Sequence, residues 1–302
     1  MREFSKQLDW AALGRLRLQA RRVADGVWVG MHQSRRRGSG LEFAGHRSYV
    51  PGDDLRWVDQ RALMRHERLL VKQFETETER TLRLVIDATR SMDFRSTGAP
   101  YRKLDMAALL AAALTRVAIR SGDPVGVNFL GGAETVPLPA AGGLEAFERS
   151  LIALTRVEAA GSIGAEPGDL ERALRPVTQR APRGTVFVVL SDLLELGDSG
   201  RETLAALGTG GRQVIVVQVL DPLEALFPLE GPVRLRASEG SFSIETNASL
   251  ARADYLGALA ALQERFRAAL HAHGGELVIC RTDEDPVRVV RAVLRAAEGR
   301  GA

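Results

Sequence analysis

Cysteine is almost absent from this sequence, since Cys280 is the only one among 302 residues. A single cysteine excludes an intramolecular disulfide and a cysteine-based metal cluster, and Cys280 lies in an apolar run where a buried thiol is expected to be unreactive. The sequence also has no run of about 18 apolar residues that could cross a bilayer, and residues 1–10 lack the apolar segment of a signal peptide. We therefore expect a cytoplasmic protein with no membrane span.

The motifs of common nucleotide-binding enzymes are absent as well. There is no G-x-x-x-x-G-K-[ST] motif, so the chain is not expected to hydrolyse nucleotides itself. Gly38 and Gly40 do not follow a buried strand, which excludes a dinucleotide-binding turn. Asp87 has no second Asp two residues later, so it matches a phosphoaspartate phosphatase poorly. We expect a protein that is not an enzyme; the alternative is a hydrolase that uses Asp87 and Asp192.

Positive charge is concentrated in the first 80 residues. They contain 16 Lys and Arg against 11 Asp and Glu, whereas residues 81–302 contain 25 against 27. We predict that residues 1–80 form a basic N-terminal extension, with an amphipathic helix over residues 10–23 that ends at Gly26. An edge strand is predicted at residues 71–81. Nucleic-acid binding by the extension is a disfavoured alternative, because no aromatic residues are interleaved with its arginines.

Charges of both signs are dense between residues 40 and 72. Exposed ion pairs add little stability one by one, so we interpret this block as a network that fixes geometry. The block is also a candidate surface for binding a protein partner. Its candidate residues are Arg47, Asp53, Asp54, Arg56 and Asp59.

Residues 81–302 alternate between apolar strands and helices. The predicted strands cover residues 82–86, 125–130, 134–138, 185–190, 214–220 and 277–280, with a short hairpin inserted within residues 224–248. Continuous apolar strands that alternate with helices are typical of a mostly parallel sheet covered on both faces. The sequence therefore predicts an α/β, doubly wound, Rossmann-like fold that follows the N-terminal extension.

Polar side chains follow two of the predicted strands. Asp87, Thr89 and Ser91 come directly after the first strand in the spacing D-x-T-x-S, and Asp192 follows the strand at residues 185–190. If these strands are neighbours, their carboxylates and hydroxyls meet in one crevice. An all-oxygen set suits a hard cation such as Mg²⁺. The alternative is structural, because Asp, Ser and Thr also cap helices and close turns.

These residues resemble the metal-ion-dependent adhesion site of von Willebrand factor A domains. That family reads D-x-S-x-S after its first strand and has an Asp after a later strand, and here Thr89 takes the place of one Ser. A middle Thr, often in T-D-L, completes the family's site, whereas this chain has Gly168-Asp169-Leu170, with Ser162 as the nearby hydroxyl. The resemblance implies a degenerate site that replaces one ligand by water.

A second resemblance covers nearly the whole chain. The segments G-S-G-L-E-F, R-S-Y-V-P-G-D-D-L-R, V-K-Q-F-E-T-E, I-D-A-T-R-S-M, D-P-L-E-A-L-F-P-L-E-G and R-T-D-E-D-P resemble the bacterial family named domain of unknown function 58. Gln60 stands where the family usually has Trp. The resemblance implies no enzymatic reaction and suggests an adaptor or chaperone partner of a MoxR-type AAA+ ATPase. In an alternative, the metal site is vestigial and residues 47–68 bind the partner.

Overall fold

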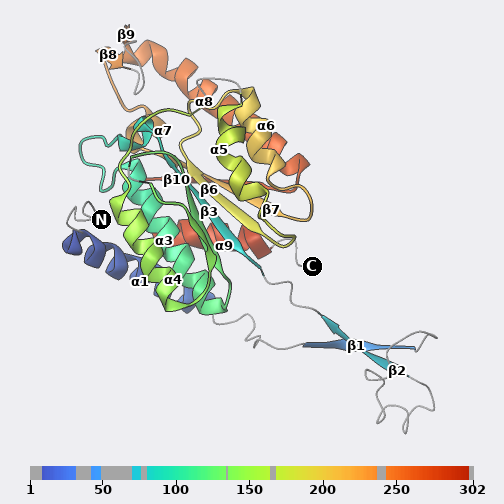
Figure 1. The fold of residues 1–302 in the computed structure, drawn as a ribbon. Helices are drawn as coiled ribbons and strands as arrows, with labels where there is room; N and C mark the ends of the chain where they lie inside the picture. Colours follow the sequence, from blue (N-terminus) through green and yellow to red (C-terminus); the bar gives the residue numbers. More distant parts are fainter. Residues whose placement is uncertain are drawn as a thin grey trace. The chain divides into compact units, whose positions relative to one another are not determined.

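The structure, a computed structural model, describes residues 9–31, 42–48, 70–75, 80–133, 135–163, 168–236 and 243–298 (Figure 1). The chain divides into two compact units. One unit comprises residues 1–33 together with 81–302, and the other comprises residues 34–80. The larger unit holds the central sheet and the candidate metal-binding residues.

Six strands of the larger unit form one sheet in the order β10-β7-β6-β3-β4-β5. All of its neighbouring pairs are parallel except β4 and β5, which are antiparallel. The first and fourth of these strands along the chain, β3 and β6, lie side by side, so the strand order reverses between them. The predicted doubly wound, mostly parallel sheet is confirmed. The strands are β3 (Leu82–Ala88), β4 (Val125–Gly131), β5 (Leu138–Ala141), β6 (Val186–Ser191), β7 (Gln213–Leu220) and β10 (Glu276–Arg281).

Helices cover both faces of this sheet. One apolar cluster lies between the sheet and the first group of helices, which is α1 (Trp10–Met31), α3 (Lys103–Ser121), α4 (Gly143–Arg156) and α9 (Pro286–Glu298). A second cluster lies on the opposite face, under α5 (Asp169–Thr178), α6 (Asp198–Ala206) and α8 (Ala248–Ala272). Successive residues of a strand point to opposite faces. Accordingly Leu84 and Ile86 belong to the first cluster and Val85 to the second.

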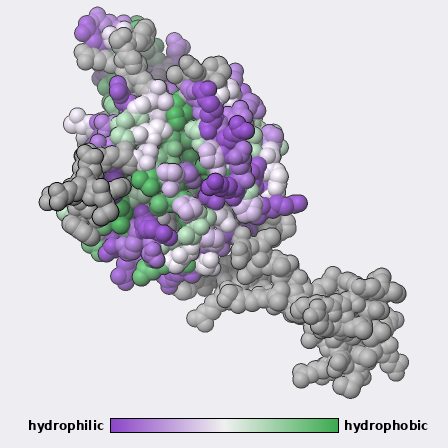
Figure 2. All heavy atoms as spheres, viewed as in Figure 1, coloured by the Kyte–Doolittle hydropathy of each residue, from purple (hydrophilic) through white to green (hydrophobic). Residues whose placement is uncertain are grey.

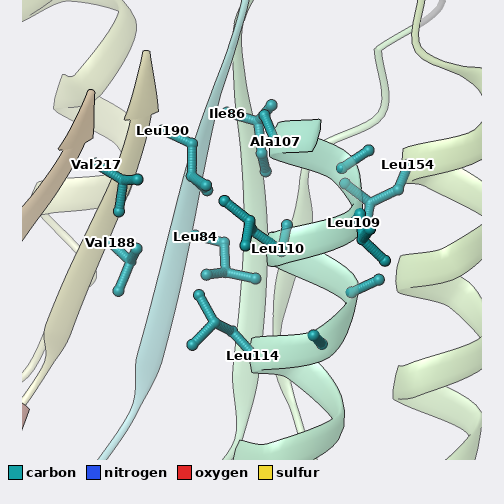
Figure 3. Packing of buried hydrophobic residues seen from close by; sticks show 14 of the residues in the cluster. Leu84, Ile86, Ala107, Leu109, Leu110, Leu114, Leu154, Val188, Leu190 and Val217 are labelled. Carbon is teal, nitrogen blue, oxygen red and sulfur yellow. The ribbon is translucent and has the colours of Figure 1, made fainter. Parts of the chain in front are cut away.

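The strand at the centre of the sheet packs directly on α3. Figure 3 shows Leu84 of β3 facing Leu110 and Leu114 of α3. Ile86 of β3 lies beside Ala107 of the same helix, and all of these side chains are buried. Burial of a leucine-sized side chain stabilises the folded state by about 1.5 to 3 kcal/mol. This packing holds in place the strand that carries Asp87.

The outer helices turn a polar side to solvent. In α5, Leu170, Leu174 and Val177 are buried, whereas Glu171 and Arg172 are exposed. Figure 2 shows hydrophilic residues gathered on the side where Figure 1 places α5 and α6, and a hydrophobic band nearer the centre of the view. Such one-sided helices are what the amphipathic pattern of the sequence predicts.

Helix α1 belongs to the larger unit, which corrects the predicted boundary at residue 80. Its apolar side, including Leu13, Val23 and Val27, is buried in the first apolar cluster. The helix also continues past Gly26 to residue 31. Gly26 is a packing position, because a Cβ atom there would lie only 3.1 Å from a methyl group of Val287 in α9. The Arg291 guanidinium of α9 donates a 2.6 Å hydrogen bond to the Gly26 carbonyl.

Residues 34–80 contain β1 (Glu42–Ser48) and β2 (Leu70–Glu75), which pair antiparallel. The described part of the edge strand predicted at residues 71–81 is therefore β2, which pairs with β1. Arg47 lies in β1 opposite Val71. The other candidate partner-binding residues, Asp53, Asp54, Arg56 and Asp59, lie outside the described residues.

Two short antiparallel features differ in place or detail from the sequence prediction. The strand expected at residues 134–138 lies instead at Leu138–Ala141, as β5. The predicted hairpin is present as β8 (Pro232–Arg236) and β9 (Ser243–Asn247), after the short helix α7 (Pro222–Leu226).

Among the described residues, no helix combines the length and the apolar character needed to span a membrane.

Candidate functional site

Asp87 and Asp192 meet at the carboxyl end of β3 and β6. The two strands pair in parallel, with Ile86 opposite Leu190, so the residues that follow them lie at the same edge of the sheet. Asp87, Thr89, Ser91 and Asp192 all line one small cavity there. In doubly wound folds, ligands bind at the carboxyl edge where the strand order reverses. The structure thus brings all four predicted metal-binding residues together.

Asp87 is buried and accepts three hydrogen bonds. Its Oδ1 accepts one from the Thr89 backbone N–H at 2.9 Å and one from the Thr89 hydroxyl at 2.6 Å. Its Oδ2 accepts one from the Ser191 hydroxyl at 2.6 Å. The hydroxyls of Thr89 and Ser91 lie 3.2 Å apart. The spacing D-x-T-x-S therefore folds into a turn that gathers its oxygens on one side.

The electrostatic environment of Asp87 disfavours its charge. Burial raises the pKa of Asp87, and repulsion from the Asp192 carboxylate raises it further. The hydrogen bonds from Ser191 and Thr89 oppose this shift, and the net pKa is about 6. Excess negative charge of this kind is relieved by a proton or by a bound cation.

Asp192 is held by a strained loop and by a lysine. Its Oδ1 accepts a 3.1 Å hydrogen bond from the Leu194 backbone N–H. The intervening Leu193 has a φ of 63°, in the left-handed region that a branched side chain rarely adopts. The other carboxylate oxygen of Asp192, Oδ2, accepts a 2.8 Å hydrogen bond from the Lys103 ammonium. Strained backbone of this type is concentrated at functional sites.

Lys103, the first residue of α3, is a site residue that the sequence analysis missed. Its side chain is 0% exposed, and its ammonium also lies 2.7 Å from Oε1 of Glu224 in α7. Burial lowers the pKa of Lys103, but the carboxylates of Asp192 and Glu224 raise it more, so its pKa is above the ordinary value. The ammonium therefore stays charged at neutral pH. A lysine at the start of a helix is usually exposed, so the sequence offered no cue.

The donor set fits a small hard cation. The cavity has a volume of about 10 Å³, enough for roughly one water-sized group. Among the described residues, no cluster of three or more His, Cys, Asp or Glu could hold a metal ion. The hydroxyls of Thr89 and Ser91 would therefore have to act as ligands beside the carboxylates, which Mg²⁺ and Ca²⁺ accept.

The hydroxyl that the sequence offered in place of the middle Thr does not reach the cavity. Ile163 lines the cavity, whereas the neighbouring Ser162 is exposed and does not contribute to it. Glu195 also lines the cavity and is a second site residue that the sequence analysis missed. It follows Asp192 by three positions, so its place in the same loop could have suggested it.

A larger groove lies beside α7. Its volume is about 360 Å³, and its apolar walls include Leu226 of α7, Leu256 and Leu259 of α8, and Ile279 of β10. Helix α7 thus contributes Leu226 to this groove and Glu224 to the ion pair with Lys103.

A family comparison identifies relatives of the chain. The model of the family described as "Protein of unknown function DUF58" matches residues 45–265. The chain belongs to this family. The uncharacterized protein Rv1480 of Mycobacterium tuberculosis is 30% identical to this DUF58 chain over 291 residues, which is 96% of this chain and 90% of that protein. The uncharacterized protein Mb1516 of Mycobacterium bovis is equally similar.

Solved structures with similar folds share little sequence with this DUF58 protein. A conserved hypothetical protein BatB from Bacteroides thetaiotaomicron is 20% identical, with a TM-score of 0.47, and the match covers 72% of this chain and 99% of that one. A von Willebrand factor type A protein from Catenulispora acidiphila is 17% identical, with a TM-score of 0.42, over 77% of this chain and 44% of that one. The strand order and the helices on both faces define the fold of this chain as a doubly wound, mostly parallel α/β fold.

Proposed function

We propose that this protein is a non-enzymatic interaction module whose partner docks at the carboxyl edge of β3 and β6. Asp87, Thr89, Ser91 and Asp192 would hold Mg²⁺ there, and the partner would supply an Asp or Glu carboxylate. The observation that supports this function is the convergence of two carboxylates and two hydroxyls on one cavity. The charge of a bound ion would make docking depend on the metal.

The size of the cavity favours docking over catalysis. Pockets for small-molecule substrates usually have volumes of about 300 to 1,000 Å³, whereas this cavity measures about 10 Å³. Asp192 is also engaged by Lys103, which makes it a poor general base for a hydrolase. We therefore propose that the protein is not an enzyme.

The partner we propose is a MoxR-type AAA+ ATPase in the bacterial cytoplasm. The support is the resemblance of the segments quoted above to the DUF58 family, whose members resemble companions of such ATPases. In this proposal the chain acts as an adaptor or chaperone partner of the ATPase.

Binding of the full chain to a purified MoxR-type ATPase tests the proposal. Because the ATPase itself needs Mg²⁺ for its nucleotide, the decisive comparison is between variants at constant Mg²⁺. We expect Asp87→Ala to weaken binding at least about tenfold, or about 1.4 kcal/mol. Asp198→Ala, which removes an exposed carboxylate, should leave the affinity unchanged. Equal affinity of Asp87→Ala and the unsubstituted protein would contradict docking at this site.

A second candidate function keeps the fold but treats the metal site as vestigial, with residues 47–68 binding the partner. The observation in its favour is the Lys103–Asp192 ion pair, which already neutralises one carboxylate without a metal. It predicts that Arg56→Glu weakens partner binding while Asp87→Ala does not.

Nucleic-acid binding through the basic residues of the N-terminal region is less well supported. Two arginines of α1, Arg17 and Arg21, already form ion pairs with Glu148 and Asp25. Nucleic-acid binding would weaken steeply as salt rises, and a failure to retain DNA or RNA at low salt would exclude it.

A further inference from the structure

The ammonium of Lys103 is a permanent positive charge built into the candidate cation site. It lies 2.8 Å from Asp192 Oδ2 and 2.7 Å from Glu224 Oε1, and its side chain is 0% exposed. Asp192 of the site and Glu224 of α7 therefore share one internal cation.

We propose that Lys103 is a positioning residue that sets the charge of the site, and that by neutralising Asp192 from inside the protein it lowers the affinity for divalent cations. This inference rests on the site proposed above. A metal ion held by Asp192 and an ammonium held by the same carboxylate repel each other. Because both cations would contact one carboxylate, only a few ångströms would separate them. At the effective dielectric of a partly buried site, a unit charge that close changes the affinity for a divalent cation by about tenfold or more.

The two carboxylates that Lys103 joins are also held by the backbone. Asp192 accepts from the Leu194 N–H, and Glu224 Oε2 accepts from the Asp221 N–H at 2.9 Å, within the capping box of α7. Both carboxylates should therefore stay in place when Lys103 is replaced. Replacement then leaves a more negative site instead of a collapsed one.

Backbone strain marks the same two carboxylates. Among the described residues, Leu193 and Phe227 are the two non-glycine positions with positive φ, at 63° and 43°. Leu193 directly follows Asp192, and Phe227 ends α7, the helix that carries Glu224. Strain of this type persists only where the surrounding structure determines it. Its position indicates that the placement of both Lys103 partners is specific.

Equilibrium binding of Mn²⁺ to the full chain, measured by the loss of the free-ion electron paramagnetic resonance signal, tests this inference. Lys103→Met removes the charge and keeps most of the apolar chain, and we expect it to bind Mn²⁺ at least about tenfold more tightly than the unsubstituted protein. Glu224→Gln leaves the ammonium less neutralised and should bind more weakly. A purely structural role for Lys103 would weaken binding in both variants, so the opposite signs separate the two explanations.

Matched variants locate the effect. Arg102→Met removes the neighbouring cation, whose ion pairs with Asp93 and Asp105 are partly exposed, and it should bind like the unsubstituted protein. Adding Asp87→Asn to Lys103→Met should abolish the tighter binding.

If Lys103→Met does not fold, Lys103→Gln takes its place, because the amide can still donate to one carboxylate. If neither variant folds without metal, we expect Mn²⁺ to restore folding.

The outcomes separate this inference from the proposed function. Mn²⁺ binding by Lys103→Met that is no tighter than that of the unsubstituted protein, or unfolded variants that Mn²⁺ does not restore, would overturn the role of Lys103. Metal-dependent docking could still stand in that case. Conversely, Lys103→Met could bind Mn²⁺ tightly while the unsubstituted protein does not bind it. That result would support the role of Lys103 and contradict the metal-dependent docking.

Discussion

Asp87 opposes folding when it is charged and no cation neutralises it. Its pKa is about 6 in the folded protein, against roughly 3.9 in an unfolded chain. Between these values the folded state keeps a proton that the unfolded state has released. The free energy of unfolding should therefore fall as the pH rises from 4 to 7, and the share of Asp87 is on the order of 2 to 3 kcal/mol.

Chemical denaturation in metal-free buffer between pH 4 and 7 measures this share. We expect the Asp87→Asn variant to lose on the order of 2 to 3 kcal/mol less stability over this range than the unsubstituted protein, because its amide does not titrate. Asp198→Asn changes a carboxylate that is 85% exposed. In this variant the free energy of unfolding should depend on pH as it does in the unsubstituted protein. Parallel curves for the unsubstituted protein and Asp87→Asn would show that the carboxylate is not destabilised by burial.

The residues of the site differ in how far the sequence could predict them. Asp87 and Asp192 are predictable because each directly follows an apolar strand, and parallel strands bring their carboxyl ends to one edge. Lys103 is not predictable in this way, since it lies 89 positions from Asp192 and 121 from Glu224. Only the folded chain shows that a residue at the start of α3 reaches both carboxylates.

Helix α1 is a structural part of the larger unit, although the sequence suggested a separate basic extension. Its buried side includes Leu13, Ala20, Val23 and Ala24, whereas its arginines lie on the other side. Alanines carry little weight in a hydrophobic pattern, yet they allow close packing of helices. The basic residues therefore dominated the prediction, and the interface with α3, α4 and α9 was missed.

Two leucines of α1 provide a test of this packing. Leu13 is 3% exposed and Leu18 is 61% exposed. We expect Leu13→Ala to lower the free energy of unfolding by about 2 to 5 kcal/mol, because it removes buried methyl groups and leaves a cavity. Leu18→Ala should change it by less than about 0.5 kcal/mol. Denaturation followed by far-ultraviolet circular dichroism compares the two variants. If Leu13→Ala lowers the free energy of unfolding as little as Leu18→Ala does, α1 lies outside the cooperative unit.

At the scale of the molecule, the order of strands is what turns separate sequence signals into a site. The sequence predicts most strands of the sheet and their polar ends, but it does not state which strands are neighbours. The observed order places β3 beside β6. Had another strand separated them, by roughly 5 Å per strand, Asp87 and Asp192 could not share one cavity. The site is therefore a property of the topology as much as of its residues.

Cys280 reports whether the larger unit opens as a whole. It is the only cysteine of the chain and is fully buried in β10. Burial raises the pKa of its thiol to about 12, with smaller contributions from Glu284 and Asp283. A thiol reagent should therefore modify the native protein at least about 1,000-fold more slowly than the unfolded chain, because modification needs an opening of the sheet.

Thiol labelling also connects α1 to the sheet. If α1 and β10 open in one cooperative step, Leu13→Ala should accelerate the labelling of Cys280 at least about 30-fold, which corresponds to about 2 kcal/mol. Leu18→Ala should leave the labelling rate unchanged. An unchanged rate in Leu13→Ala, with the stability loss still visible by circular dichroism, would mean that α1 detaches while the sheet stays closed. Cooperative opening would instead make the helix that precedes residues 34–80 part of the same folding unit as the last strand of the sheet.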